Sequence, residues 1–232
     1  MKLYKSESKA FGICFIIAFL SYGIGSGLID SLISSPDFLS QVYADNRSIV
    51  IGVVLIGLLH SFVNIALPVI MLPILKPFSS TLAYGYLSAA IIATTILALG
   101  SIFLLMLIPL SHEHANADVS LIPNFELMGS LLKKGAYYCY HMGMALWSIG
   151  GLMLVALLYK SKLTPRPLSV LGVIGYLFLV IGSVMSLLEK NDVVEIISVI
   201  PGGIFEITLS IWLIIKGFRT STKPSAISRG AV

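Results

Sequence analysis

Charged residues are scarce in this chain, at 11% of its 232 residues against about a quarter in ordinary soluble domains. Hydrophobic residues make up 57%. The longest polar interval between the hydrophobic runs, residues 111–136, is too short for a second folded domain. This composition excludes a soluble globular protein and predicts a single polytopic membrane domain over residues 1–232.

Cysteine and the motifs of common membrane enzymes are also scarce. Cys14 and Cys139 fall at opposite depths of their hydrophobic runs and belong to no CxxC pair, so neither a disulfide nor a thiol centre is predicted. The chain lacks HExxH, GxSxG and P-loop sequences. No lysine lies in the middle of a hydrophobic run, which disfavours a retinal Schiff base. The sequence therefore predicts no cofactor and favours a protein that is not an enzyme.

Six long hydrophobic runs are what the sequence has in abundance. Each exceeds the 20 or so residues that a helix needs to cross a hydrocarbon core of about 30 Å. Backbone polar groups cannot stay unpaired in lipid, so these runs should be helices. We expect an all-α bundle of six transmembrane helices, with residues 111–136 as an outer loop. The predicted spans cover residues 10–33, 49–75, 82–110, 137–159, 168–188 and 193–215, with either Val193 or Pro201 as the first residue of the last helix.

Basic residues alternate between the loops. Because cytoplasmic loops carry the excess of Lys and Arg, we expect both termini in the cytoplasm of a multi-pass protein of the cell inner membrane. The net charge of +4 then reflects topology and does not point to nucleic acid. The residues predicted inside are Lys2, Lys5, Lys9, Lys76, Lys160, Lys162, Arg166, Lys216, Arg219, Lys223 and Arg229, and those outside are Arg47, Lys133, Lys134 and Lys190.

Glu206 stands out as the acidic residue that we place well inside a predicted span. A charge at that depth costs about 2.5–3.5 kcal/mol on insertion scales, which the surrounding Ile and Leu offset. Glu206 and Ser210 share one face of their helix. His60 and Asn64 are also four residues apart, near the middle of the second span. We expect Glu206 to lie within hydrogen-bonding reach of His60, directly or through water.

Two interpretations of Glu206, His60, Asn64 and Ser210 remain open. Ionisable groups inside a membrane are functional-site hypotheses by default, so these residues are candidates for binding a ligand or a proton. Polar pairs between membrane helices also fix helix register, so a purely structural Glu–His contact is the alternative.

His112 and His114 form an HxH pair within the predicted outer loop. Two imidazoles can contribute to a metal site, but they do not complete a tetrahedral shell. A solvated polar loop is therefore the favoured interpretation, and no metal is predicted.

Gly23 and Gly27 have the GxxxG spacing that allows a neighbouring helix to approach closely. We expect this pair to serve packing inside the molecule. The alternative is a homodimer formed across this face of the first helix.

Two stretches, residues 159–176 (YKSKLTPRPLSVLGVIGY) and 201–218 (PGGIFEITLSIWLIIKGF), carry a family resemblance. Together they resemble a family of bacterial integral membrane proteins known only as a domain of unknown function, family 4386. The resemblance extends over nearly the whole chain and implies a compact multi-helix fold in a bacterial inner membrane. It implies no activity, so no residue acquires a role from it.

Three functions agree with these features. The first is a non-enzymatic regulatory, immunity or stress-related membrane protein, which contacts membrane lipids and a membrane-protein or peptide partner. The second is a small proton-linked transporter or permease that uses Glu206 and His60. The third is a lipid-modifying membrane enzyme, the least favoured because no nucleophile or metal set is visible.

Overall fold

The computed structural model describes residues 4–189 and 191–219. It is about 89% helical, and the described residues contain no strand. Six helical segments within them are long and apolar enough to cross a membrane, which confirms the all-α prediction and the six spans. Lys2, Lys190, Lys223 and Arg229, which entered the predicted charge pattern, lie outside the described residues.

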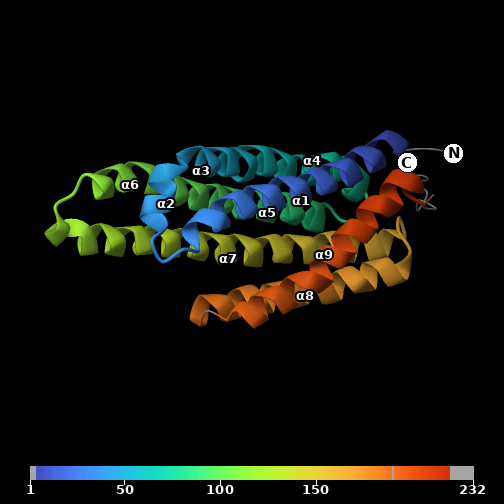
Figure 1. Ribbon diagram of the computed structural model, residues 1–232. Helices are drawn as coiled ribbons and strands as arrows, with labels where there is room; N and C mark the ends of the chain where they lie inside the picture. The colour runs from blue at the N-terminus through green and yellow to red at the C-terminus, as the bar shows by residue number, and fades with distance from the viewer. Residues whose placement is uncertain (1–3, 190, 220–232) are drawn as a thin grey trace, which may run out of the picture.

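The spans contain the main helices of the fold (Figure 1). The first span is α1, and the second combines α3, a π-helical segment and α4. The third combines α5 and α6, the fourth is α7 with a short 3-10 turn before it, and the last two are α8 and α9. The bounds are α1 Lys5–Ile33, α2 Phe38–Ala44, α3 Asn46–Val53, π-helix Val54–His60, α4 Ser61–Leu75, α5 Ser80–Leu105, α6 Leu107–Ala115, 3-10 turn Val119–Leu121, α7 Ile122–Ser161, α8 Arg166–Leu188 and α9 Asp192–Ile215.

The spans form a ring in which neighbours along the chain are also neighbours in space. Helix α1 packs on α4, α4 on α5, α5 on α7, α7 on α8, and α8 on α9. Helix α9 closes the ring by packing on α1. The described chain begins and ends at the same end of this ring (Figure 1), where the backbone N–H of Arg219 donates to the Leu163 carbonyl at 2.8 Å.

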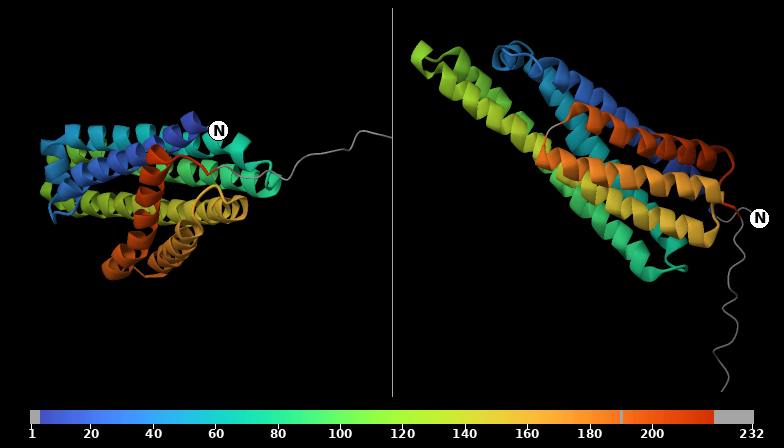
Figure 2. Two further views of the ribbon diagram at one scale, coloured as in Figure 1. Left: turned by 90° about the vertical axis from the view of Figure 1, so that its right-hand side faces the viewer. Right: turned by 90° about the horizontal axis from the view of Figure 1, so that it is seen from below.

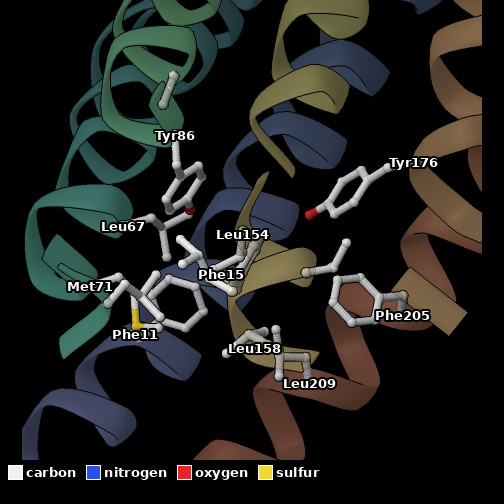
Figure 3. Close-up of a cluster of buried hydrophobic side chains, with 14 of the residues drawn as sticks. Phe11, Phe15, Leu67, Met71, Tyr86, Leu154, Leu158, Tyr176, Phe205 and Leu209 are labelled. Carbon is white, nitrogen blue, oxygen red and sulfur yellow. The ribbon is translucent and has the colours of Figure 1, made fainter. Parts of the chain in front are cut away.

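The end of the ring that holds the chain ends is filled by an apolar core. Side chains from all six spans meet there and exclude water (Figure 3). This apolar core includes Phe11, Phe15, Leu67, Met71, Tyr86, Leu154, Leu158, Tyr176, Phe205 and Leu209. A smaller apolar cluster at the opposite end joins the end of α1 to α2, α3 and α6, through Ile29, Phe38, Leu39, Val42, Ile49, Val53, Leu107 and Leu110.

Residues 111–136, the expected outer loop, are mostly helical. Helix α6 continues to Ala115, and α7 begins at Ile122 and runs without interruption into the membrane span. Pro123 lies in the first turn of α7, where a proline costs no helical hydrogen bond, and the following residues are mostly good helix formers. The first turns of α7 therefore project beyond the turn between α8 and α9 (Figure 1).

Helix α9 begins at Asp192, and not at Pro201, which lies inside it. The Asn191 side chain caps the helix by accepting hydrogen bonds from the backbone N–H groups of Val193 and Val194, at 3.1 and 3.2 Å. At the other end, Gly217 has a φ of 73°, the left-handed conformation that terminates helices and favours glycine. Glu206 is therefore in the middle of a continuous helix.

Candidate functional site

A cavity of about 190 Å³ lies inside the ring, and we call it the inner chamber. Its wall receives side chains from every one of the six spans, so the chamber is central and not a groove between two helices. The lining residues are Phe15, Ala18, Phe19, Tyr22, Gly23, His60, Asn64, Leu97, Tyr140, Met144, Trp147, Leu179, Val199, Gly202, Gly203 and Glu206.

Glu206 supplies the acidic group of the inner chamber, and neighbouring helices orient it. The Trp147 indole N–H of α7 donates to Glu206 Oε1 at 3.3 Å, and the Tyr176 hydroxyl of α8 donates to the same oxygen at 2.7 Å. Both donors are buried and neutral, so they hold the carboxyl group without supplying a compensating charge. Glu206 itself is half-buried because it faces the chamber.

Close packing of α8 against α9 brings Tyr176 to Glu206. A Cβ added to Gly175 would lie 2.7 Å from the Cα of Gly202, so the two backbones touch at this level. Glycine pairs allow such an approach between membrane helices, and side chains one turn further along then meet. The sequence pattern showed that Glu206 and Ser210 share one face of α9, but it did not show which helix packs beside Glu206.

His60 lines the same chamber but does not bond to Glu206. His60 Nδ1 lies 3.0 Å from the Ala18 carbonyl oxygen, so Nδ1 is the donor, and His60 Nε2 accepts from the Asn64 amide at 2.9 Å. Both ring nitrogens are therefore occupied by α1 and α4. The direct Glu206–His60 hydrogen bond that we expected is absent from the described residues for this reason.

The π-helical segment places His60 at the chamber wall. Residues Val54–His60 carry one extra residue per turn, and such segments occur frequently at functional sites. His60 is the last residue of this segment, and it contacts Ala18 of α1 while Asn64 lies beside it on the same face. Helix α4 then continues through Pro68 and Pro73 to Leu75.

Ser210 is the remaining residue of the predicted site, and it lies outside the chamber wall. Its hydroxyl donates to the Glu206 backbone carbonyl at 2.6 Å, and its side chain is fully buried. Its backbone carbonyl faces Gly12 of α1, so this level of α9 packs tightly against the first helix. Ser210 therefore contributes to helix packing, and its hydroxyl is used within α9.

A second cavity, of about 900 Å³, adjoins the inner chamber on the side away from the chain ends. We call it the vestibule. Tyr22, Leu97 and Tyr140 line both cavities and form the boundary between them. The Tyr22 and Tyr140 rings stack at 5.7 Å, and the Tyr22 ring also lies 5.3 Å from that of His60. Two aromatic rings thus separate a wide, accessible cavity from the smaller one that contains Glu206.

Glu195 is the polar centre of the vestibule, and the sequence-based prediction missed it. The Tyr137 hydroxyl donates to Glu195 Oε1 at 2.5 Å, and His141 Nε2 lies 3.6 Å from that oxygen. Glu195 and Glu206 are eleven residues apart, which is three helical turns, so they face the same way. This eleven-residue spacing was the sequence signal that could have identified Glu195 as a second residue of the site. Asp30, Lys133 and Lys134 add charges of both signs to the vestibule.

The apolar core closes the inner chamber on the other side. Phe15 belongs both to the chamber wall and to the core, and Phe205, the residue before Glu206 in α9, belongs to the core. Figure 3 shows these rings converging with Leu154, Leu158 and Leu209. The cavity system therefore widens toward one end of the bundle and ends blindly at the core.

Gly23 and Gly27 do not take part in internal packing, which corrects our expectation for the GxxxG pair. A Cβ at either position would meet nothing within 4 Å, because α1 and α9 diverge beyond the contact of Phe19 with Gly203 (Figure 2, left). Gly25 is the glycine of this stretch that packs, against the backbone of Gly52 in α3.

The HxH pair lies on α6. The His112 ring packs edge-on against Tyr43 of α2 at 5.0 Å. Within residues 4–189 and 191–219, no three His, Cys, Asp or Glu side chains come together in a way that can hold a metal ion. Cys14 and Cys139 are both free thiols.

A family model described as "Domain of unknown function (DUF4386)" matches residues 10–217, so the chain belongs to this family. The match covers all six spans and both cavities. No curated protein and no solved structure matches the chain. The structure and the family together describe a multi-pass membrane protein of an uncharacterised family.

Proposed function

We propose that this member of the DUF4386 family is a small proton-linked carrier of the bacterial inner membrane, which binds its ligand beside Glu206. The observation that carries this proposal is the inner chamber. It lies at the centre of all six spans, adjoins the vestibule on one side and ends at the apolar core on the other. A carrier needs a site that is reachable from one side of the membrane at a time.

Glu206 is the group that would exchange a proton for the ligand. Its hydrogen bonds from Trp147 and Tyr176 both reach Oε1, and among the described residues Oε2 has no hydrogen-bond donor. A carboxyl group that only fixed helix register would be fully engaged by its neighbours. The position of Glu206 in the chamber wall, where its side chain is partly buried, favours the functional interpretation over the structural one. A water bridge between Glu206 and His60 stays part of the proposal.

Charge distribution supports an orientation with both termini in the cytoplasm and the vestibule facing outward. The basic residues at the end of the ring that holds the chain ends outnumber those at the vestibule end, as expected for a cytoplasmic face. The described residues of that basic end are Lys5, Lys9, Lys76, Lys160, Lys162, Arg166, Lys216 and Arg219. We also propose that residues 1–232 form one domain in contact with membrane lipids.

The test is proton movement in reconstituted vesicles. The purified protein is placed in phosphatidylethanolamine–phosphatidylglycerol vesicles that enclose a pH-sensitive dye, and small amines, carboxylic acids and amino acids are added in turn. We expect at least one of these classes to move protons only when the protein is present. Glu206→Gln should abolish this signal while protein recovery is retained.

Glu126→Gln is the matched control for that experiment. Glu126 is an exposed carboxylate of the projecting part of α7, far from the chamber, so its loss should leave proton movement unchanged. Proton movement that survives Glu206→Gln, or that no compound class elicits, would contradict the carrier.

A second candidate is a non-enzymatic regulatory, immunity or stress-related protein that binds a membrane-protein or peptide partner. The projecting extension formed by α2, α6 and the start of α7 favours it, because Val119, Leu127 and Leu131 expose apolar side chains there. Specific co-purification of a partner, abolished by Leu127→Glu and unaffected by Glu206→Gln, would support this candidate. A second copy of the chain is one such partner.

A lipid-modifying enzyme is supported least. The polar side chains of the inner chamber are those of Tyr22, His60, Asn64, Tyr140, Trp147 and Glu206. Because His60 already uses both of its ring nitrogens, this set offers no base paired with a nucleophile.

A further inference from the structure

The inner chamber has an unbalanced charge. Glu206 is its acidic residue, and no Lys or Arg is among the lining residues. The hydrogen bonds that Glu206 accepts come from an indole and a phenol, which carry no charge. His60 is held as the neutral tautomer, with Nδ1–H directed to a carbonyl and Nε2 accepting. Within residues 4–189 and 191–219, a deprotonated Glu206 therefore has no cationic side chain beside it in the chamber wall, and a bound ligand can supply a cation.

Aromatic rings surround that carboxylate. Tyr22 and Tyr140 belong to the chamber wall on the vestibule side, and Trp147 of α7 with Phe15 and Phe19 of α1 lines the rest of it. The faces of such rings attract ammonium groups, most strongly when water is excluded. A carboxylate within an aromatic wall is suited to an organic cation. It is poorly suited to a carboxylate, phosphate or sulfate, which both the charge and the ring faces would repel.

The chamber is too small for a whole drug-sized ligand. Its volume of about 190 Å³ is below the roughly 300–1,000 Å³ of typical ligand pockets. The wall is open, however, where α1 and α9 diverge, because a Cβ at Gly23 would meet nothing within 4 Å. Val199 lines the chamber at this point and is itself exposed, and Leu20 and Ile24 of α1 are exposed beside the gap. An apolar chain can leave the chamber there toward lipid.

We infer that the ligand of the inner chamber is an organic cation with an apolar tail, its ammonium group at Glu206 and its tail in the gap between α1 and α9. This inference rests on the proposed ligand-binding role of the chamber. It adds the chemical class of the ligand and a lateral path for its apolar part.

The experiment uses Trp147 as a reporter. The chain has two tryptophans, so Trp212→Phe leaves Trp147, which contacts Glu206, as the sole tryptophan. The Trp212→Phe protein in lipid nanodiscs is titrated with tetramethylammonium and with butyl-, hexyl- and octyltrimethylammonium. Octyl sulfate and octanol serve as ligands of matched length that are anionic and neutral.

We expect the fluorescence of Trp147 to respond to the ammonium series, with an affinity that rises with tail length. Octyl sulfate and octanol should produce no saturable response. Glu206→Gln should weaken octyltrimethylammonium binding by about 10-fold or more, since it removes the charge that faces the ammonium group. Equal affinity for octyl sulfate would overturn the inference even if the Glu206→Gln protein did not fold.

Gly23→Leu tests the path of the tail. Added atoms at Gly23 occupy open space, so the variant should fold while its side chain narrows the gap. We expect it to weaken octyltrimethylammonium binding several-fold and to affect tetramethylammonium binding far less. Gly27→Leu is the control, because Gly27 is equally open but lies one turn further from the chamber. Equal effects of both variants on both ligands would refute the lateral path.

Failure of this inference is distinguishable from failure of the carrier. Ammonium binding without proton movement in vesicles would support the ligand class and exclude the proton-linked carrier. Proton movement with carboxylic acids alone, without a response of Trp147 to any ammonium ion, would overturn the ligand class and leave the carrier in place.

Discussion

The filled half of the ring around Leu154 and the hollow half around Tyr22 are built by the same six spans. In the filled half, small residues bring helices into backbone contact, as at Gly12 with Ser210. In the hollow half, α1 and α9 separate, and aromatic side chains such as Tyr22 and Tyr140 line the space instead. Spacing between helices, and not the overall hydrophobicity of each span, decides which half holds a cavity.

The two carboxylates of the last helix extend this comparison. Glu195 in the vestibule meets Tyr137 and His141, so a titratable neighbour accompanies it. Among the described residues, the hydrogen-bond donors of Glu206 in the inner chamber are the neutral groups of Trp147 and Tyr176. One helix face therefore presents two acids to one cavity system, with a compensating group available only to the outer acid.

The largest loss of stability should come from truncating a leucine of the filled half. Leu154→Ala leaves a void among fully buried side chains, and such changes cost about 2–5 kcal/mol in well-packed interiors. We expect a value near the lower end, because lipid replaces water as the solvent and mainly packing is lost. Detergent-to-SDS unfolding followed by circular dichroism measures it.

Leu97→Ala is the matched change in the hollow half. Leu97 borders both cavities, so it loses fewer packing contacts, and its truncation should cost less than that of Leu154. Equal costs would mean that the cavities collapse around Leu97, and the proposed difference between the two halves would then be wrong.

The next largest loss of stability should come from replacing a glycine at a close contact between helices, in comparison with a glycine in open space. In Gly175→Ala the new methyl group would overlap the backbone of Gly202, which cannot move aside as a side chain can, so we expect a loss of about 1–3 kcal/mol. Gly23→Ala adds a methyl group to open space and should be neutral or slightly stabilising, since alanine favours the helix. Thermal unfolding in detergent compares the two, and a destabilising Gly23→Ala would contradict the open gap.

The smallest difference in stability is expected between variants of two buried tyrosines, Tyr176 and Tyr86 (Figure 3). Tyr176→Phe removes the hydrogen bond to Glu206 and should cost about 1 kcal/mol. Tyr86→Phe removes a hydroxyl that has no hydrogen-bond partner among the described residues, so stability should stay the same or rise. The same unfolding assay applies, and a larger loss for Tyr86→Phe would reveal a polar contact of its hydroxyl.

The number and the approximate positions of the long helices were predictable from the pattern of hydrophobic residues along the sequence. Six runs exceeded the bilayer thickness, and the structure has six helices of that kind, with Glu206 inside the last one. The low hydrophobicity of residues 111–136 indicated that they leave the membrane, but it did not show that α7 runs without interruption from Ile122 into its span. Helix propensity is a weak signal, and packing of Gly129 against Phe38 adds to it.

The partners of Glu206 could not be predicted. Trp147 and Tyr176 are 59 and 30 residues away along the chain, and periodicity identifies a face of a helix without identifying what that face meets. His60 was a reasonable candidate by depth. It failed as a direct partner because the Ala18 carbonyl and Asn64 occupy its nitrogens, a local arrangement that depth alone does not reveal.

Hydrophobicity and length along the chain predicted six helices able to cross a membrane and placed Glu206 well inside the last of them, because unpaired backbone groups in lipid are so costly that such segments should be helical. The tertiary structure alone decided where the helices touch and where they part. Backbone contact at glycines such as Gly175 and Gly202, and its absence at Gly23, depends on which faces meet in space, and that choice created the chamber around Glu206.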